Sequence, residues 1–173
     1  MRGALSLCLT LALVAQALGQ TKSPYPGVTN FTRVDATVAC GGAAEVSTLD
    51  ALKKDGFKSV INLRMASEPG ANIEQNQAKA KELGLVYVHI PFSAGSPDPK
   101  VIDQFLGAIA NKANQPVFVH CASASRVGAV WMVKRVLQDG WPIEQAKTEA
   151  EAIGLASPKL AAFATEYINS HKR

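Results

Sequence analysis

The chain has 173 residues, of which 47% are hydrophobic and 18% are charged, and its 3 cysteines are too few for a disulfide-stapled scaffold. This length suits one domain that buries a single core and is short for two. The formal net charge of +4 comes from scattered basic residues, which fits an anionic ligand but does not indicate nucleic-acid binding.

Residues 1–19 are predicted to be a signal peptide. Arg2 supplies a positive start, and the apolar stretch 5–14 is too short to span a bilayer. Small residues at Ala17 and Gly19 offer a cleavage pattern, and we expect the cut after Gly19. The mature protein would then be secreted or periplasmic and free of the membrane; the alternative is an uncleaved membrane anchor.

Short β-rich runs alternate with helical patterns along the rest of the chain. Residues 20–30 carry two prolines and a glycine among polar residues, which is typical of a flexible leader, so one domain is expected over 31–173. The predicted strands are 34–38, 58–63, 85–90 and 116–120. The predicted helices are 47–55, 73–83, 96–110 and 127–137, with two more beginning at Pro142 and at Ser157.

Strands separated by helices of this length need crossover connections. The sequence therefore predicts an α/β fold with a mostly parallel sheet of about four or five strands flanked by helices. Ligands of such sheets bind beyond the carboxyl ends of the strands. The run 116–120 is apolar almost throughout, as expected for a central strand covered on both faces, so a site is expected in the loop that follows it.

That loop reads His-Cys-Ala-Ser-Ala-Ser-Arg over residues 120–126 and precedes a predicted helix. A sharp turn here leaves backbone N–H groups unpaired, and with the positive end of the helix dipole they form an anion site. Such surroundings favour the thiolate form of a cysteine, so Cys121 is predicted to be a nucleophile. Arg126 can hold two oxygens of a tetrahedral oxyanion at once, and His120 is expected to act as a scaffold behind the thiolate.

The loop resembles the active-site loop of cysteine-dependent phosphatases. The wider chain, over about residues 28–170, resembles a bacterial phosphatase-like domain found alone or fused to β-lactamase-fold hydrolases. The resemblance runs through segments 31–35, 40–42, 56–64 and 87–91 as well as the loop. It implies the fold of tyrosine and dual-specificity phosphatases, a phosphocysteine intermediate on Cys121, and no metal or organic cofactor. The residues that it implies for phosphate binding are Ala122, Ser123, Ala124, Ser125 and Arg126.

Three departures from that family pattern affect the loop. Four residues separate Cys121 from Arg126, as this branch often has, whereas ordinary phosphatases of the superfamily have five. Four is also the spacing of rhodanese-type sulfurtransferases, which carry a persulfide on cysteine. Ala124 stands where this branch usually has glycine, and a left-handed backbone there would cost on the order of 1–2 kcal/mol. Val127 replaces the usual serine or threonine, so help in releasing the thiolate would fall to a loop serine or be missing.

A general acid is needed to protonate the departing oxygen of a phosphate ester. Asp98, in the loop beyond a predicted strand, is the leading candidate, and the alternative is that it only stabilises a helix N-terminus. Glu68 is the reserve acid, and Asp103 is expected to be solvated. Arg64 would extend the positive field or pair with Glu68.

Cys40 precedes two glycines at the end of a predicted strand, so its loop could approach the catalytic mouth. In an oxidising compartment it could form a disulfide with Cys121, which would make the enzyme redox-gated. The alternative is a buried thiol with a packing role.

The sequence thus predicts a monomeric enzyme that hydrolyses phosphomonoesters of a small molecule or a protein. Cys121 is the nucleophile, Arg126 the oxyanion clamp and Asp98 the candidate acid. Two alternatives stay open: sulfur transfer through a persulfide on Cys121, and a catalytically silent module that binds phosphorylated or sulfated ligands.

Overall fold

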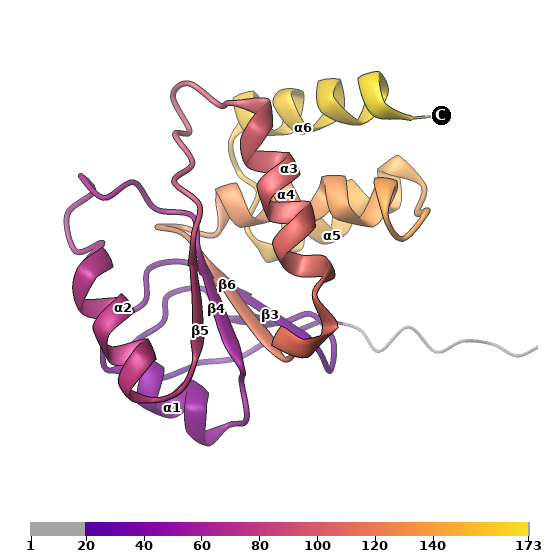
Figure 1. Cartoon of the computed structure of the whole chain (residues 1–173). Coiled ribbons are helices and arrows are strands. Elements are labelled where there is room, and N and C mark those ends of the chain that lie inside the picture. Colours follow the sequence, from indigo (N-terminus) through magenta and orange to yellow (C-terminus); the bar gives the residue numbers. More distant parts are fainter. Residues whose placement is uncertain (1–19, 173) are drawn as a thin grey trace, which may run out of the picture.

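The structure is a computed structural model that describes residues 20–172 (Figure 1). The predicted signal peptide lies outside these residues. Six strands are present in this part of the chain: β1 Thr21–Lys22, β2 Thr32–Arg33, β3 Val38–Gly41, β4 Ser59–Asn62, β5 Val86–His89 and β6 Val117–His120. The helices are α1 Thr48–Lys54, α2 Ile73–Glu82, α3 Pro99–Ala110, the 3₁₀ turn η1 Lys112–Asn114, α4 Ser125–Leu137, α5 Ile143–Ile153 and α6 Pro158–His171. Within the described residues no helix is both long and apolar enough to cross a membrane.

The strands form one sheet in the order β1-β2-β3-β6-β4-β5. Strands β3, β6, β4 and β5 run parallel, while the two-residue strands β1 and β2 extend the sheet antiparallel. The predicted α/β fold with a mostly parallel sheet is confirmed, and the short antiparallel strands make the sheet mixed. Strand β6 is completely buried between β3 and β4, so the loop after it emerges from the middle of the sheet.

Helices cover both faces of the sheet (Figure 1). Alternating side chains of β6 point to opposite faces: Phe118 joins the core under α1 and α2, whereas Val117, Val119 and Cys121 join the larger core under α3 to α6. The chain therefore delivers Cys121 to the side of the sheet that holds the larger helical layer.

Two predicted elements differ from the structure. The strand expected over 34–38 begins only at Val38, because the Asp35 carboxylate accepts hydrogen bonds from the N–H groups of Thr37 (2.7 Å) and Val38 (2.9 Å) and bends the chain into a turn. Residues 20–30, which were expected to have no regular structure, are the second. They contribute β1, and Tyr25 stacks on Phe31 with ring centroids 4.4 Å apart.

Helix α4, which begins just after Cys121, packs closely on the end of α5. At Gly128 the approach is so close that an added Cβ would lie 2.8 Å from both the Ala150 carbonyl oxygen and the Leu155 Cβ. Contacts this short with backbone require the helices to move apart. Gly128 therefore sets the distance between α4 and the segment that carries one wall of the site.

We expect Gly128→Ala to lower the free energy of unfolding by about 1–3 kcal/mol through overpacking. Gly107→Ala is the matched control, because Gly107 is exposed in α3 with nothing within 4 Å of an added Cβ. There alanine should stabilise the protein by about 0.5–1 kcal/mol. Urea unfolding measures both, and a Gly128→Ala protein at least as stable as the parent would contradict the packing argument.

Candidate active site

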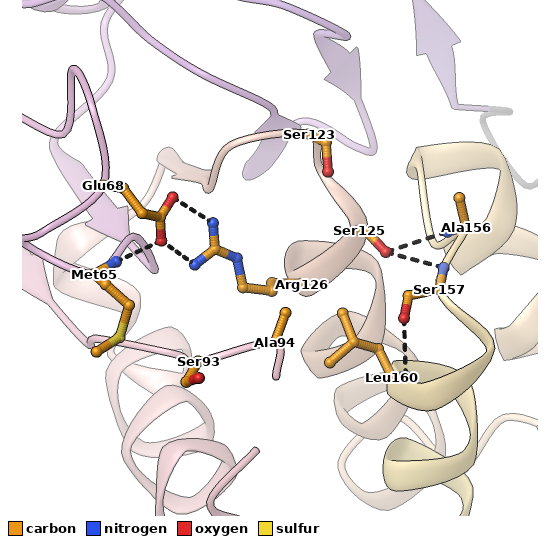
Figure 2. Close-up of a pocket in the computed structure, with 10 residues that line it drawn as sticks. All are labelled: Met65, Glu68, Ser93, Ala94, Ser123, Ser125, Arg126, Ala156, Ser157 and Leu160. Atoms are coloured by element: carbon orange, nitrogen blue, oxygen red, sulfur yellow. Dashed lines mark hydrogen bonds and ion pairs between the residues drawn. The ribbon is translucent and has the colours of Figure 1, made fainter. Parts of the chain in front are cut away.

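Cys121 directly follows β6, and the loop it begins ends in α4 at Ser125. The loop lies at the carboxyl end of the parallel strands, where the sequence placed the site. A cleft of about 580 Å³ opens in front of it (Figure 2). The cleft is lined by Met65, Glu68, Ser93, Ala94, Ser123, Ser125, Arg126, Ala156, Ser157 and Leu160. Cys121 itself is fully buried and is not among the residues that line the cleft.

The backbone of the loop keeps donors free for an anion. In the described part of the chain, the N–H groups of Ala122, Ser123 and Ala124 have no hydrogen-bond acceptor. The carbonyl oxygen of Ala122 instead accepts a bond from the N–H of Ala43 at 2.8 Å. Unpaired N–H groups beside a helix N-terminus are the arrangement that binds phosphate and similar anions.

Arg126 is fixed along one edge of its guanidinium group. Its Nη1 donates to the carboxylate of Glu68 at 2.5 Å and to the carbonyl oxygens of Phe92 (2.8 Å) and Leu63 (3.3 Å), while Nη2 donates to the second carboxylate oxygen of Glu68 at 2.8 Å. None of these bonds uses the Nε–H group, and the Cys121 thiol lies close enough to raise the pKa of Arg126. Because guanidinium carries five N–H donors in a planar fork, the edge made by Nε and Nη2 still has two donors for an oxyanion.

Glu68 is the anionic partner of Arg126 (Figure 2). The hydrogen bonds from Arg126, with a further bond from the Met65 N–H, lower the pKa of Glu68 to about 2. Burial tends to lower the pKa of Arg126, but the bond to Glu68 and the nearby Cys121 outweigh it, so the pKa of Arg126 is raised. Glu68 is therefore ionised at neutral pH and cannot donate the proton expected of a reserve acid.

Arg64 supports this ion pair from behind. Its Nε lies 3.3 Å from Glu68 Oε2, and its other nitrogens donate to the carbonyl oxygens of Gly70 (2.8 Å) and Pro69 (2.5 Å). Of the two roles that the sequence allowed, the pairing with Glu68 is the one observed. Arg64 is buried and does not line the cleft, so it adds positive charge only at a distance.

His120 lies beneath the loop as a neutral ring. It stacks on Phe118 at 5.5 Å between ring centroids, with only 5° between the ring planes. Burial lowers the pKa of His120 to about 4, although contacts with the backbone of Cys121 and Gly42 act in the opposite direction. A neutral, buried imidazole fits the predicted scaffold role.

The two loop serines differ in position. The Ser125 hydroxyl accepts hydrogen bonds from the N–H groups of Ala156 (3.2 Å) and Ser157 (3.3 Å), which ties the start of α4 to the start of α6 (Figure 2). Ser123 is exposed at the rim of the cleft. Within the described residues neither serine hydroxyl is hydrogen-bonded to Cys121, and Ser125 instead connects α4 to the segment before α6.

Asp98 is not brought to the cleft. It is exposed, it is the N-cap of α3, and its carboxylate accepts a 2.9 Å bond from the N–H of Lys100. The helix-capping alternative therefore matches its contacts, whereas the general-acid role would require the loop to move. Asp103 lies one turn further on, is exposed as expected, and accepts a bond from the Tyr167 hydroxyl.

Cys40 and Cys121 are both free, buried thiols, so the disulfide considered from the sequence is not formed. Cys40 is paired in register with Val119, which makes Cys121 its diagonal neighbour on the same face of the sheet. A strand spacing of about 4.8 Å and a two-residue rise of about 6.6 Å place the Cα atoms of diagonal neighbours about 8 Å apart, which is beyond the usual reach of a disulfide. Burial also raises the pKa of the Cys40 thiol, which fits a packing role.

Ala124 adopts the left-handed backbone that the sequence analysis considered, with φ 72° and ψ −5°. It is the N-cap of α4 and is fully buried. For any residue with a side chain, this conformation costs on the order of 1–2 kcal/mol. The surrounding contacts therefore hold the loop in a shape that alanine by itself does not favour.

Residues behind the loop were missed by the sequence analysis. The side-chain amide of Asn30 donates to the carbonyl oxygen of Ser123 (3.4 Å) and to that of Ile153 (3.2 Å). Ala43 holds Ala122 through its backbone, as described above. Asn30 and Ala43 lie far from Cys121 in the sequence, and nothing in the sequence links either one to the loop, so only the folded chain reveals these contacts.

Comparison with known proteins identifies relatives of this chain. The family model described as "Beta-lactamase hydrolase-like protein, phosphatase-like domain" matches residues 27–138. A β-lactamase hydrolase-like protein of Agrobacterium fabrum (strain C58) is 29% identical over 107 residues, which make up 61% of this chain and 25% of that protein. The matched region thus spans about a quarter of that relative's length.

Solved structures share the fold at low sequence identity. A putative phosphatase (DUF442) from Shewanella putrefaciens CN-32 is 24% identical with a TM-score of 0.71, covering 85% of this chain and 96% of that one. The core catalytic domain of the PP-IP phosphatase SIW14 from S. cerevisiae is 20% identical with a TM-score of 0.69, covering 83% and 88%. P. aeruginosa TpbA is 18% identical with a TM-score of 0.65, covering 86% and 88%. These likenesses confirm the cysteine-phosphatase-like fold.

We expect Ala124→Gly to raise the free energy of unfolding by about 0.5–1 kcal/mol. Glycine removes the strain of the left-handed backbone in the folded state. It also raises the conformational entropy of the unfolded chain, which offsets part of that stabilisation. Ala152→Gly, at an exposed helical position in α5, is the control and should lose about 1 kcal/mol. Urea unfolding of both proteins is the measurement; equal losses would mean that the backbone at Ala124 is not strained.

Proposed function

Because the chain belongs to the family of the phosphatase-like domain of β-lactamase hydrolase-like proteins, we propose that it hydrolyses phosphomonoesters through a phosphocysteine intermediate on Cys121. One observation carries the proposal: the cysteine begins a loop whose N–H groups are unpaired, and the free edge of Arg126 belongs to the same loop. A thiol, free backbone donors and a fixed guanidinium are the components that phosphoryl transfer to sulfur requires.

In the first step, the phosphoryl oxygens bind to the loop N–H groups and to Nε and Nη2 of Arg126. The Cys121 thiolate attacks phosphorus, so an S–P bond forms while the P–O bond to the leaving group breaks and its electron pair stays on the departing oxygen. In the second step, water attacks phosphorus, the P–S bond breaks, and inorganic phosphate and the thiolate are released. Positive charge and aligned donors stabilise the equatorial oxygens in both steps.

No carboxylic acid among the described residues that line the cleft is poised to protonate the leaving oxygen. Glu68 is the one carboxylate among the described residues that line the cleft, and its bonds to Arg126 keep it ionised. An enzyme without a poised acid depends on leaving groups that depart readily as anions. This favours aryl phosphates, including phosphotyrosine in a protein or an aromatic phosphate of small size, over phosphoserine.

The proposed setting is outside the cytoplasm. The predicted signal peptide supports a secreted or periplasmic location, and we propose a monomer whose substrate is a phosphorylated small molecule or protein. After cleavage Cys40 and Cys121 would be the remaining cysteines of the sequence. The spacing of their strand positions favours a free nucleophile even in an oxidising compartment.

We expect acid quenching during turnover of an aryl phosphate to trap one phosphoryl group on Cys121, detected by mass spectrometry of the peptide that contains it. Cys121→Ser should abolish both the adduct and the activity, whereas the control Cys40→Ala should retain them. Thiosulfate tests the sulfurtransferase alternative on the same protein. A persulfide on Cys121 without a phosphoryl adduct would contradict the proposal, and full activity in Cys121→Ser would exclude both reactions.

We expect Asp98→Asn to leave the turnover of an aryl phosphate nearly unchanged, because Asp98 is exposed and caps α3 instead of lining the cleft. Asparagine also caps helices well, so the change removes the acid and keeps the cap, whereas Asp98→Ala removes both. The measurement is kcat over a range of pH. A general acid is worth about 100-fold or more, and a loss of that size would show that the loop brings Asp98 to the substrate.

A further inference from the structure

The side-chain amide of Asn30 connects the anion loop to the C-terminus of α5. Its Nδ2 donates to the Ser123 carbonyl oxygen at 3.4 Å and to the carbonyl oxygen of Ile153, the last residue of α5, at 3.2 Å. The two bonds use both hydrogens of one amide group. Asn30 thus joins three segments that are far apart in the sequence.

The backbone around Asn30 is held in a conformation that directs its side-chain amide toward the Ser123 and Ile153 carbonyl oxygens. Asn30 has a left-handed φ of 55°, a conformation that asparagine tolerates better than most residues. Its neighbour Thr29 is held on both sides, because the Thr29 N–H donates to the Ala43 oxygen (2.9 Å) and the Thr29 oxygen accepts from the N–H of Gly42 (2.7 Å). The segment is therefore bound to the loop after β3, which also holds Ala122.

Packing on the far side of the amide is tight. Gly154, directly after Ile153, has a φ of 145°, and a Cβ added to it would lie 2.8 Å from both Asn30 Nδ2 and Ala124 Cβ. The same Cβ would lie 3.2 Å from the Ser123 carbonyl oxygen. The amide, the carbonyl and the strained Ala124 thus meet in one small contact area.

The bond to Ser123 also determines where the next N–H points. In a trans peptide, the C=O of one residue and the N–H of the following residue point in opposite directions. Asn30, which does not line the cleft, holds the Ser123 carbonyl oxygen, so the Ala124 N–H points away from Asn30. Ala43 has the same effect on the preceding peptide, since it holds the Ala122 oxygen and the Ser123 N–H therefore points away from Ala43.

We propose that Asn30 is a positioning residue of the active site, which directs the Ala124 N–H at the phosphoryl group and at the thiolate of Cys121. This inference rests on the proposed function for its substrate, but not for its effect on the thiol. Without the amide, the peptide between Ser123 and Ala124 is free to rotate. The site then loses one aligned donor, and both anions that it stabilises become less stable.

The test compares two substitutions at Asn30 with a matched control. Asn30→Gly keeps the left-handed backbone and removes the amide, while Asn30→Asp keeps the shape and replaces the donor by an oxygen that repels both carbonyls. Asn72→Gly is the control, because Asn72 is also left-handed, with φ 45°, and its side chain makes no cap bond to α2. Circular dichroism and urea unfolding establish that each protein is folded.

The first readout is the rate at which iodoacetamide alkylates Cys121 as a function of pH, which reports the thiolate without any substrate. The second is the concentration of inorganic phosphate that protects Cys121 from alkylation. We expect both Asn30 variants to shift the alkylation profile to higher pH and to need about tenfold or more phosphate, since one oxyanion donor is worth this much or more in other enzymes. The control should match the parent protein.

Alkylation and protection unchanged in folded Asn30→Gly and Asn30→Asp would overturn the proposal. An equal change in Asn72→Gly would also overturn it, because the effect would then belong to any left-handed asparagine. If the parent protein shows no phosphatase activity but the Asn30 variants still shift the thiol profile, the proposed function fails and the positioning role of Asn30 stands.

Discussion

The buried contact between Arg126 and Glu68 is the interaction on which the candidate site depends. Arg126 is only 7% exposed, and a guanidinium at such depth is costly unless its charge is compensated and its donors are used. Glu68 supplies the charge, while the carbonyl oxygens of Leu63 and Phe92 take further donors. These partners come from the segments after β4 and β5, so the loops beyond three neighbouring strands converge on one side chain. These partners occupy one edge of the guanidinium group and hold it in place. The edge made by Nε and Nη2 is left to bind an oxyanion.

The parallel sheet provides the second constraint. Strand β6 is buried on both faces and paired on both edges, so Cys121 leaves the sheet at a fixed point and in a fixed direction. The helix that follows must begin almost at once, which requires the left-handed turn at Ala124. Glycine would make that turn without strain. In this chain the contacts from Asn30, Gly154 and Ser125 hold the loop instead.

The sequence predicted the parallel strands and the Cys121 loop because these signals are local. An apolar run between turn residues marks a buried strand, and small residues between a cysteine and an arginine mark an anion loop. The strand expected over 34–38 was placed too early because the pattern does not show that the Asp35 side chain captures backbone donors. The two-residue strand β1 depends on pairing with β2 and has no periodicity of its own.

The sequence also left open which partners the carboxylates bind. Glu68 pairs with Arg126, which is 58 positions away in the sequence, whereas Asp98 caps its own helix.

The N-terminal segment changes how the boundaries of the domain are understood. Residues 20–30 look like a linker by composition, yet they carry a strand, an aromatic stack and the amide that holds Ser123. A polar segment rich in proline and glycine can be ordered when its backbone groups find partners in the folded domain, as those of Thr29 do with Gly42 and Ala43. Because the same contacts reach the anion loop, order in this segment and the geometry of the loop are coupled. Removing residues 20–30 as a dispensable leader would therefore alter the site itself.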